Sequence, residues 1–241
     1  KNRHKLLNKV YVSPTLMEMP EPRPTDKGPF EVNDRLADVS VIAMGEVESP
    51  EDVILDEDDN LYSGNRHGDI IRFFPPDYQT HEVYAHIGGA PLGMTFDKMG
   101  NLLVCVGGMG LYMVAKEDRK VSLVTDETNR SLLSVVDDSR LRLADDLDIA
   151  PDGKVYFSEA TVRYEMHDWP VDALESSGNG RIICYDPATK RTRTILKNLT
   201  FPNGVCTAHD GKSILFAESW ACRINQFWLE GPKKGKLEVL V

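Results

Sequence analysis

Long apolar runs and paired cysteines are both missing from this sequence. No stretch approaches the roughly 18 apolar residues of a membrane-spanning helix. The 4 cysteines are widely spaced and include no Cys-x-x-Cys pair, which excludes a zinc ribbon or a dense disulfide framework. We expect the cysteines to be small apolar residues of strands, and one disulfide remains possible if the protein is exported. Because the sequence begins at Lys1 and not at methionine, an upstream signal or membrane anchor stays open.

Positive charge is scarce as well. The chain of 241 residues has 28 Lys and Arg against 38 Asp and Glu, a formal net charge of −10. A nucleic-acid partner needs clustered Lys and Arg to neutralise phosphates, and no basic stripe is present. The composition therefore argues against nucleic acid as a partner. We expect a small-molecule partner, and the oligomeric state stays undetermined.

Four segments of the chain repeat one another. Each has alternating apolar residues, a turn rich in Asp, Gly or Asn, and a second apolar run, a pattern that predicts a β-hairpin. They read PEDVILDEDDNLY from Pro50, PLGMTFDKMGNLL from Pro91, ADDLDIAPDGKVY from Ala144 and PNGVCTAHDGKSIL from Pro202, so the starts lie 41, 53 and 58 residues apart. This spacing is typical of the four-stranded blades of a β-propeller. The predicted fold class is therefore all-β.

Each repeat extends into four expected strands. The expected ranges are 53–55, 61–63, 69–74 and 82–86; 94–96, 102–106, 111–115 and 120–124; a strand from 145, 154–158, 181–185 and 192–196; and 204–208, 213–217, 223–229 and 236–241. Residues 1–40, with prolines at 14, 20, 22, 24 and 29, predict an extended arm, because proline fixes φ and removes a donor. Residues 41–241 form the predicted propeller.

Two insertions interrupt the blades. The polar segment 125–143 is compatible with a short helix or an extra strand around Leu132–Val136. The connection 160–180 is long for a compact domain and is therefore a candidate lid over the central channel. Its Tyr164, His167 and Trp169 are predicted to line a substrate pocket together with Leu92.

The second residue of each repeat is the predicted functional position. It holds Glu51, Leu92, Asp145 and Asn203. Equivalent strands of successive blades would bring these side chains to one level around a single axis. Three of the four carry oxygen, so the sequence predicts a polar site in the channel.

Longer segments then identify a family. GPFEVNDRL (28–36), SPEDV (49–53), FSEATVRY (157–164), GNGRIICYDPATKRTRTILKNLTFPNGV (178–205) and AESWACRINQFWLEGPKKG (217–235) resemble the strictosidine synthase-like proteins, which are grouped with gluconolactonases and paraoxonases. The resemblance implies a six-bladed propeller, of which this sequence holds about four blades. Four blades of six would leave two broad open flanks. We therefore expect the sequence to be part of a longer chain and not a closed four-bladed ring.

The resemblance also implies a divalent ion, most often Ca²⁺, in the channel. Its ligand positions match Glu51, Asp145 and Asn203, the residues that the repeats select. Such oxygen ligands suit Ca²⁺, and an ion there would assist hydrolysis of an ester or lactone. Where the family usually has Asn-Asp, this chain has Asp145-Asp146, which adds negative charge. Asp146 is the predicted base.

Two other functions stay open. One is the condensation of an arylethylamine with an aldehyde, as in strictosidine synthase, for which no residue of this sequence is assigned. The other is a non-catalytic binding propeller presented at a membrane by an upstream anchor. A secretory or membrane-associated setting is favoured over a cytoplasmic one.

Three further polar residues carry structural expectations. Glu159 and Glu218 occupy equivalent places after the second strands of the last two repeats, where they either face the rim of the channel or pair with Arg163 and Arg223, and the sequence favours the ion pairs. His209, in an Asp-Gly turn, is predicted to be an exposed hairpin residue.

Overall fold

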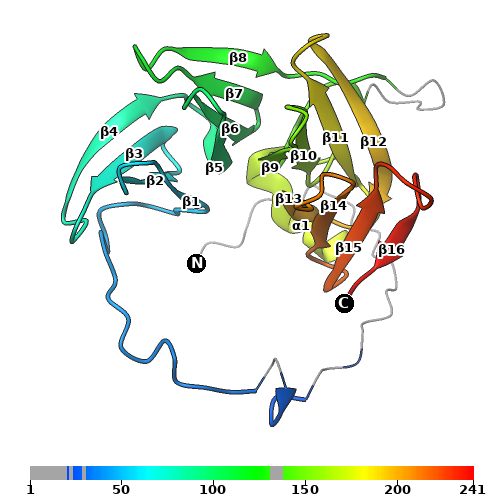
Figure 1. Ribbon diagram of the computed structural model, residues 1–241, viewed down its shortest axis with the longest axis horizontal. Coiled ribbons are helices and arrows are strands. Elements are labelled where there is room, and N and C mark those ends of the chain that lie inside the picture. The colour runs from blue at the N-terminus through cyan, green and yellow to red at the C-terminus, as the bar shows by residue number, and fades with distance from the viewer. Residues whose placement is uncertain (1–20, 22–23, 29–30, 131–137) are drawn as a thin grey trace, which may run out of the picture.

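Four antiparallel sheets form the blades of a partial propeller in the computed structural model, which describes residues 21, 24–28, 31–130 and 138–241. Each sheet contains four strands that are consecutive in the chain, so every blade is a simple meander. Figure 1 shows the blades side by side in an open arc, with the first strand of each blade nearest the centre. The all-β propeller predicted from the repeats is confirmed.

The strand bounds follow the repeats closely. Blade 1 has β1 (Val53–Leu55), β2 (Leu61–Gly64), β3 (Asp69–Phe74) and β4 (Thr80–His86); blade 2 has β5 (Ala90–Phe96), β6 (Leu102–Gly107), β7 (Gly110–Val114) and β8 (Val121–Thr125); blade 3 has β9 (Ala144–Ile149), β10 (Val155–Glu159), β11 (Gly180–Asp186) and β12 (Arg191–Leu199); blade 4 has β13 (Pro202–Thr207), β14 (Ser213–Glu218), β15 (Arg223–Trp228) and β16 (Leu237–Val239). The hairpin turns also match. At the tip of β9 and β10, Gly153 has a φ of +86°, which explains the Asp-Gly sequence.

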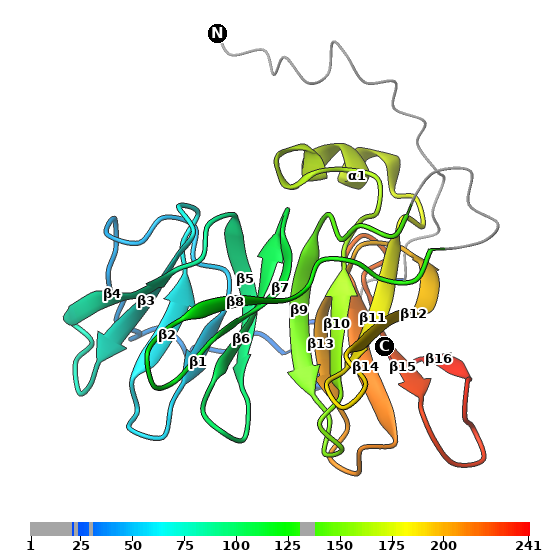
Figure 2. The same ribbon diagram turned by 90° about the horizontal axis from the view of Figure 1, so that it is seen from above.

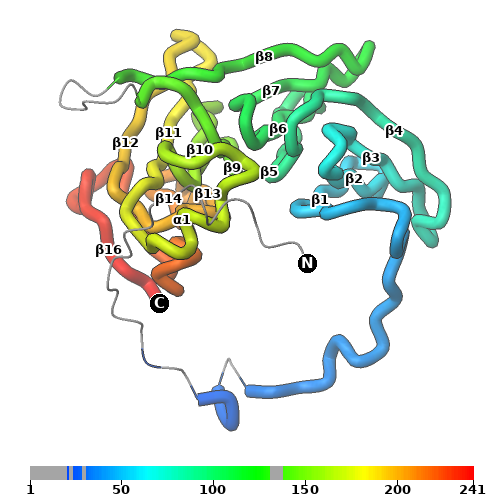
Figure 3. The backbone as a smooth tube through the Cα atoms, turned by 180° about the vertical axis from the view of Figure 1, so that it is seen from behind, coloured from blue at the N-terminus to red at the C-terminus, as the bar shows by residue number. Residues whose placement is uncertain are grey.

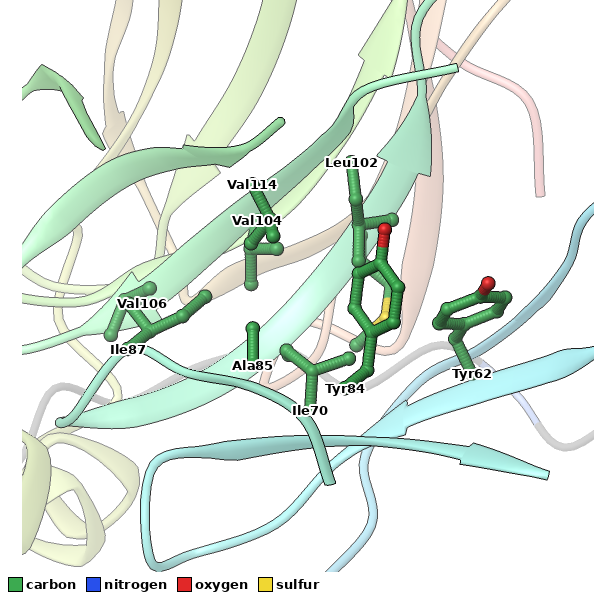
Figure 4. Close-up of a cluster of buried hydrophobic side chains, with 10 residues drawn as sticks. Tyr62, Ile70, Tyr84, Ala85, Ile87, Leu102, Val104, Val106 and Val114 are labelled. Carbon is green, nitrogen blue, oxygen red and sulfur yellow. The ribbon is translucent and has the colours of Figure 1, made fainter. Parts of the chain in front are cut away.

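The cores lie between neighbouring blades. Every residue of β6 is buried, because its alternating side chains enter two cores. Leu102 and Val104 pack against blade 1 (Figure 4), while Leu103 and Cys105 pack against blade 3. A third core joins blades 3 and 4 and includes Cys184. Each fully buried Leu or Val side chain contributes about 1.5–3 kcal/mol, so these cores hold the blades together and leave the axis free for polar residues.

The cysteines divide between core and surface. Cys105 and Cys184 are buried, as expected of small strand residues, whereas Cys206 and Cys222 are exposed. All four are free thiols.

The connection between β10 and β11 contains a helix that the sequence analysis missed. A short 3₁₀ turn, η2 (Met166–Asp168), leads directly into α1 (Trp169–Glu175). Pro170 stands in the first turn of α1, where its missing N–H costs nothing. Figure 2 shows α1 projecting above one end of the blades.

Residues 31–50 run along the open side of the arc before they enter β1 (Figures 1 and 3). They hold turns and bends but no strand or helix. Residues 1–20, half of the predicted arm, lie outside the described part of the chain. The predicted helix or strand around Leu132–Val136 lies outside it as well, although the flanking residues Glu127 and Arg140 form an isolated bridge.

Candidate functional site

The four first strands bring the repeat positions together. Around the axis, β1 contacts β5, β5 contacts β9, and β9 contacts β13. Glu51, Leu92, Asp145 and Asn203 all line one cavity of about 550 Å³. The structure therefore places the four second residues of the repeats at a single pocket.

Asp145 is the most unusual of these residues. It is only 4% exposed, and within the described residues its carboxylate has neither a hydrogen-bond donor nor a cation as partner. The side chains of Glu51 and Asn203 likewise make no hydrogen bond or ion pair inside the described ranges. A buried carboxylate without a partner costs several kcal/mol unless it is protonated or binds a cation.

The raised pKa values of the pocket carboxylates reflect the same cost of burial. Desolvation, and then the carboxylates of Asp52 and Asp146, raise the pKa of Glu51 to about 7. Desolvation, and then Glu51 and Asp146, raise the pKa of Asp145 well above its usual value. Crowded acids at low exposure resist ionisation, and a cation between them would relieve this cost.

The donor set fits a hard divalent cation. Two carboxylates and one amide carbonyl face one cavity from three blades, and Ca²⁺ takes oxygen ligands of these kinds. No cluster of three or more His, Cys, Asp or Glu side chains with metal-binding geometry occurs in the residues that the structure describes. The candidate set of Glu51, Asp145 and Asn203 therefore counts two carboxylates and one amide, without the thiolates or imidazoles that softer metals prefer.

Asp146 connects two blades. Its Oδ2 accepts a hydrogen bond from the backbone N–H of Val205 (2.6 Å) in blade 4. Asp52 acts in the same way in blade 1, where its Oδ2 accepts from the N–H of Met94 in blade 2 (2.9 Å). Burial above all raises the pKa of Asp146 to about 6. Asp146 is not among the residues that line the cavity.

Gly93 makes room for this carboxylate. A Cβ atom at Gly93 would lie 2.3 Å from Oδ1 and 2.6 Å from Cα of Asp146. Only glycine allows so close an approach of β5 to β9. The repeat alternates accordingly, with Asp52 and Asp146 in blades 1 and 3 and with Gly93 and Gly204 in blades 2 and 4.

Apolar residues make up much of the remaining lining of the cavity. Of the predicted pocket residues, Leu92 and Trp169 line it, and so do residues that sequence reasoning missed: Leu143, Met166, Phe201 and Trp220. The ring of Trp169 is stacked on that of Trp220, with centroids 6.2 Å apart, and Phe201 lies 4.5 Å from Trp220. Leu143 and Phe201 directly precede the inner strands β9 and β13, and this place at the start of an inner strand was the available signal for them.

Tyr164 and His167 lie elsewhere. Tyr164 is buried, and desolvation by burial, with a further contribution from the carboxylate of Glu175 in α1, raises its pKa to about 12. The side chain of His167 is 78% exposed and lies 3.4 Å from Asp168. Neither lines the cavity. His209 is exposed, as its turn predicts.

One predicted ion pair is wrong and the other is confirmed. Glu218 pairs with Arg223 (2.6 Å). Glu159, however, pairs with Arg181 on the adjacent strand β11, whereas Arg163 lies 3.3 Å from Glu175. The register explains the error, because Glu159 and Arg181 are direct cross-strand neighbours, just as Glu218 and Arg223 are.

Comparison with known proteins identifies the family. A family profile described as strictosidine synthase matches residues 145–232, and one described as strictosidine synthase-like, N-terminal, matches residues 28–73. Protein STRICTOSIDINE SYNTHASE-LIKE 4 of Arabidopsis thaliana is 31% identical over 211 residues, which are 86% of this chain and 55% of that protein. This chain belongs to the strictosidine synthase-like family.

This chain also matches an animal protein. The adipocyte plasma membrane-associated protein of Salmo salar is 29% identical over 247 residues, which are 95% of this chain and 56% of that protein. The chain thus spans about half the length of the curated relatives it matches. In the described residues, no helix has the length and apolar character that crossing a bilayer requires.

Solved structures share the fold. A gluconolactonase from Xanthomonas campestris superposes with a TM-score of 0.62 at 15% identity, over 80% of this chain and 62% of that chain. A calcium-binding protein, regucalcin, from Agrobacterium tumefaciens superposes with a TM-score of 0.56 at 16% identity, over 80% of this chain and 59% of that chain. Because the sequence identities are this low, the superpositions show a common propeller fold and nothing further.

Proposed function

We propose that this strictosidine synthase-like chain carries the site of a divalent-cation-dependent hydrolase of esters or lactones, with Ca²⁺ as the cation. The observation that supports the proposal is the unpartnered, buried carboxylate of Asp145, which lines one cavity with Glu51 and Asn203. The gluconolactonase and the calcium-binding protein that share the fold are consistent with it.

Different residues of the chain would have different roles in this chemistry. Glu51, Asp145 and Asn203 would hold the cation, and when bound it supplies Lewis-acid polarisation of a substrate carbonyl. Met166 and Trp169 cover the cavity from the α1 connection, which limits the access of bulk water. Asp146 stays the predicted base. It adjoins Asp145, and the Val205 N–H that holds its Oδ2 fixes its orientation.

The test is turnover of simple esters and lactones by the full-length protein, with and without a chelator. We expect activity that is lost with the chelator and restored by Ca²⁺. The variants Glu51→Gln and Asn203→Ala should lose it as well, whereas Glu57→Gln, in an exposed turn of the same blade, should keep it. Activity indifferent to both the chelator and these variants would remove the cation from the mechanism.

An amine–aldehyde condensation is the rival reaction, since the strictosidine synthase profile matches residues 145–232. Formation of a condensation product from tryptamine and an aldehyde, without ester or lactone turnover, would replace our proposal.

The setting of the protein is proposed separately. The name of the Salmo salar relative places that protein at the plasma membrane. By analogy, we propose a secretory or membrane-associated location for this chain. Fractionation of cells that express the full-length protein would test this location, and recovery only in the cytosol would contradict it.

A further inference from the structure

Two equivalent groups of contacts lie directly behind the apolar side of the cavity. In blade 3, Oε1 of Glu159 accepts from the backbone N–H of Arg142 (2.6 Å), and the next residue, Leu143, accepts at its carbonyl oxygen from the N–H of Ala160 (2.9 Å). In blade 4, Oε1 of Glu218 accepts from the N–H of Thr200 (2.6 Å), and the carbonyl oxygen of Phe201 accepts from the N–H of Ser219 (3.0 Å).

An arginine from the third strand completes each group. Arg181 at the start of β11 binds Glu159, and Arg223 at the start of β15 binds Glu218 through Nε and Nη2, both at 2.6 Å. We call the two groups the blade 3 clamp (Glu159 and Arg181) and the blade 4 clamp (Glu218 and Arg223). Glu159 and Glu218 are both almost completely buried.

Each clamp fixes one residue of the cavity. Leu143 and Phe201 immediately precede the inner strands β9 and β13, and both line the same cavity as Asp145. Phe201 has a φ of +53°, a conformation that a bulky residue keeps only where its surroundings enforce it. Glu218 holds the N–H of the preceding residue, Thr200, and the N–H of Ser219, next to Glu218, holds the carbonyl oxygen of Phe201 itself.

Blades 1 and 2 have no such clamp. The positions equivalent to Glu159 and Glu218 are Gly64 and Gly107, at the ends of β2 and β6. Among the residues that the structure describes, the clamps thus occur only in the two blades that supply Leu143 and Phe201. A requirement of blade folding alone would apply to all four blades.

We propose that the blade 4 clamp is a positioning device for the site, and that Phe201 is a specificity-determining residue. Resting on the function proposed above, the clamp makes the pocket select esters and lactones with a neutral, apolar substituent. Polyhydroxylated lactones are disfavoured, because hydroxyl groups against Phe201, Trp169 and Trp220 would be desolvated without partners. The carboxylates of Glu51 and Asp145 in the same cavity disfavour anionic substrates.

The experiment compares three lactones on the full-length protein with Ca²⁺ present. γ-Nonalactone carries an apolar tail that reaches Phe201, γ-butyrolactone has no tail, and glucono-δ-lactone is polyhydroxylated. We expect kcat/KM to be highest for γ-nonalactone. Phe201→Ala and Glu218→Leu should lower it about 10-fold through KM, with little change for γ-butyrolactone and none in Ca²⁺ affinity. Glu218→Gln keeps an acceptor for Thr200 and should restore most of the loss.

The matched control is Glu238→Gln in the same blade. Glu238 of β16 binds Lys233 and Trp228, and none of the three lines the cavity. Glu238→Gln should therefore leave the ratio of kcat/KM for γ-nonalactone to kcat/KM for γ-butyrolactone unchanged. If Glu218 had a purely structural role, Glu218→Leu would lower kcat/KM for γ-nonalactone and for γ-butyrolactone by the same factor, and that result would overturn the proposal. A wild-type preference for glucono-δ-lactone would overturn it as well, while leaving the hydrolase function intact.

A binding measurement separates this inference from the proposed function. 5-Pentyl-2-pyrrolidinone is the lactam analogue of γ-nonalactone and resists hydrolysis. If the protein turns over no ester or lactone, calorimetric titration with this lactam still decides the matter. Binding that weakens about 10-fold in Phe201→Ala would support the role of Phe201 without the reaction, and binding that is absent or unaffected would contradict it.

Discussion

Buried acids occur in two settings in this propeller. Glu159 and Glu218, at the ends of β10 and β14, each have an arginine and a backbone N–H as partners. Asp145 and Glu51, at the axis, have crowded carboxylates as neighbours and no partner within the described chain. Buried acids with such partners, which we call compensated, add stability or cost little, whereas buried acids without partners, which we call uncompensated, reduce stability unless a proton or a cation neutralises them. The proposed cation site rests on this difference.

The largest expected effect is on a compensated acid. Arg181 is 2% exposed, and Arg181→Met would leave the charge of Glu159 buried without its partner. We expect a loss of about 3–5 kcal/mol in the free energy of unfolding, measured by urea denaturation. Arg223→Met should cost clearly less, because the Arg223 side chain is 41% exposed. Equal losses in the two variants would contradict the account of burial.

A smaller effect is expected at the contact between blades 2 and 3. Gly93→Ala would place a methyl group against Asp146, backbone included, at a cost of about 1–3 kcal/mol. Asp146 is intermediate between the two kinds of buried acid, because it has a backbone N–H as partner but no arginine or other cation. Gly204→Ala is the control, because its Cβ would lie 3.8 Å from Asp146. Denaturation of both variants checks the prediction, and a harmless Gly93→Ala would show that β5 and β9 are further apart.

The uncompensated acids should behave in the opposite way. In the presence of a chelator at pH 8, Asp145→Asn removes a buried charge and should raise the melting temperature by about 2–4 °C. The same change at a compensated acid, Glu159→Gln, should lower it. Thermal denaturation of the two variants beside the wild type gives the sign directly. A destabilising Asp145→Asn in the metal-free protein would mean that Asp145 has a structural partner.

The smallest effect concerns pH. The pKa of Glu51 is raised to about 7 in the folded protein, so the folded state binds its proton more tightly than the unfolded state does. The corresponding stability is present below about pH 4.5 and is lost as the pH rises through about 7. Metal-free wild type should therefore lose more stability between pH 5 and pH 8 than Glu51→Gln does, by about a few tenths of a kcal/mol to 1 kcal/mol. Parallel pH profiles would contradict the raised pKa.

The sequence predicted the fold because the blade signal is local. Alternating side chains and Asp-Gly turns mark each strand, and the positions of Glu51, Asp145 and Asn203 follow from the repeat alone. The apolar side of the pocket was harder to predict. Leu143 and Phe201 lie just before the repeats, and their direction depends on contacts with Glu159 and Glu218 from a later strand.

The α1 connection was the least predictable part. Its aromatic residues suggested a lid, but the pattern did not distinguish Trp169, which lines the cavity, from Tyr164, which is buried outside it, or His167, which is exposed. Of the three, Trp169 belongs to the seven-residue helix α1, His167 to the 3₁₀ turn and Tyr164 to the segment before it, so no single periodic pattern relates them. Pro170 in its first turn was the available signal for the helix itself.

The central claim is that Glu51, Asp145 and Asn203 bind one divalent cation, and calorimetric titration of the metal-free, full-length protein with Ca²⁺ tests it most directly. We predict one site in the wild type, weakened more than about 100-fold in Asp145→Asn and unchanged in Glu57→Gln. Wild-type affinity in a folded Asp145→Asn variant, or no Ca²⁺ binding by the wild type at all, would contradict the account.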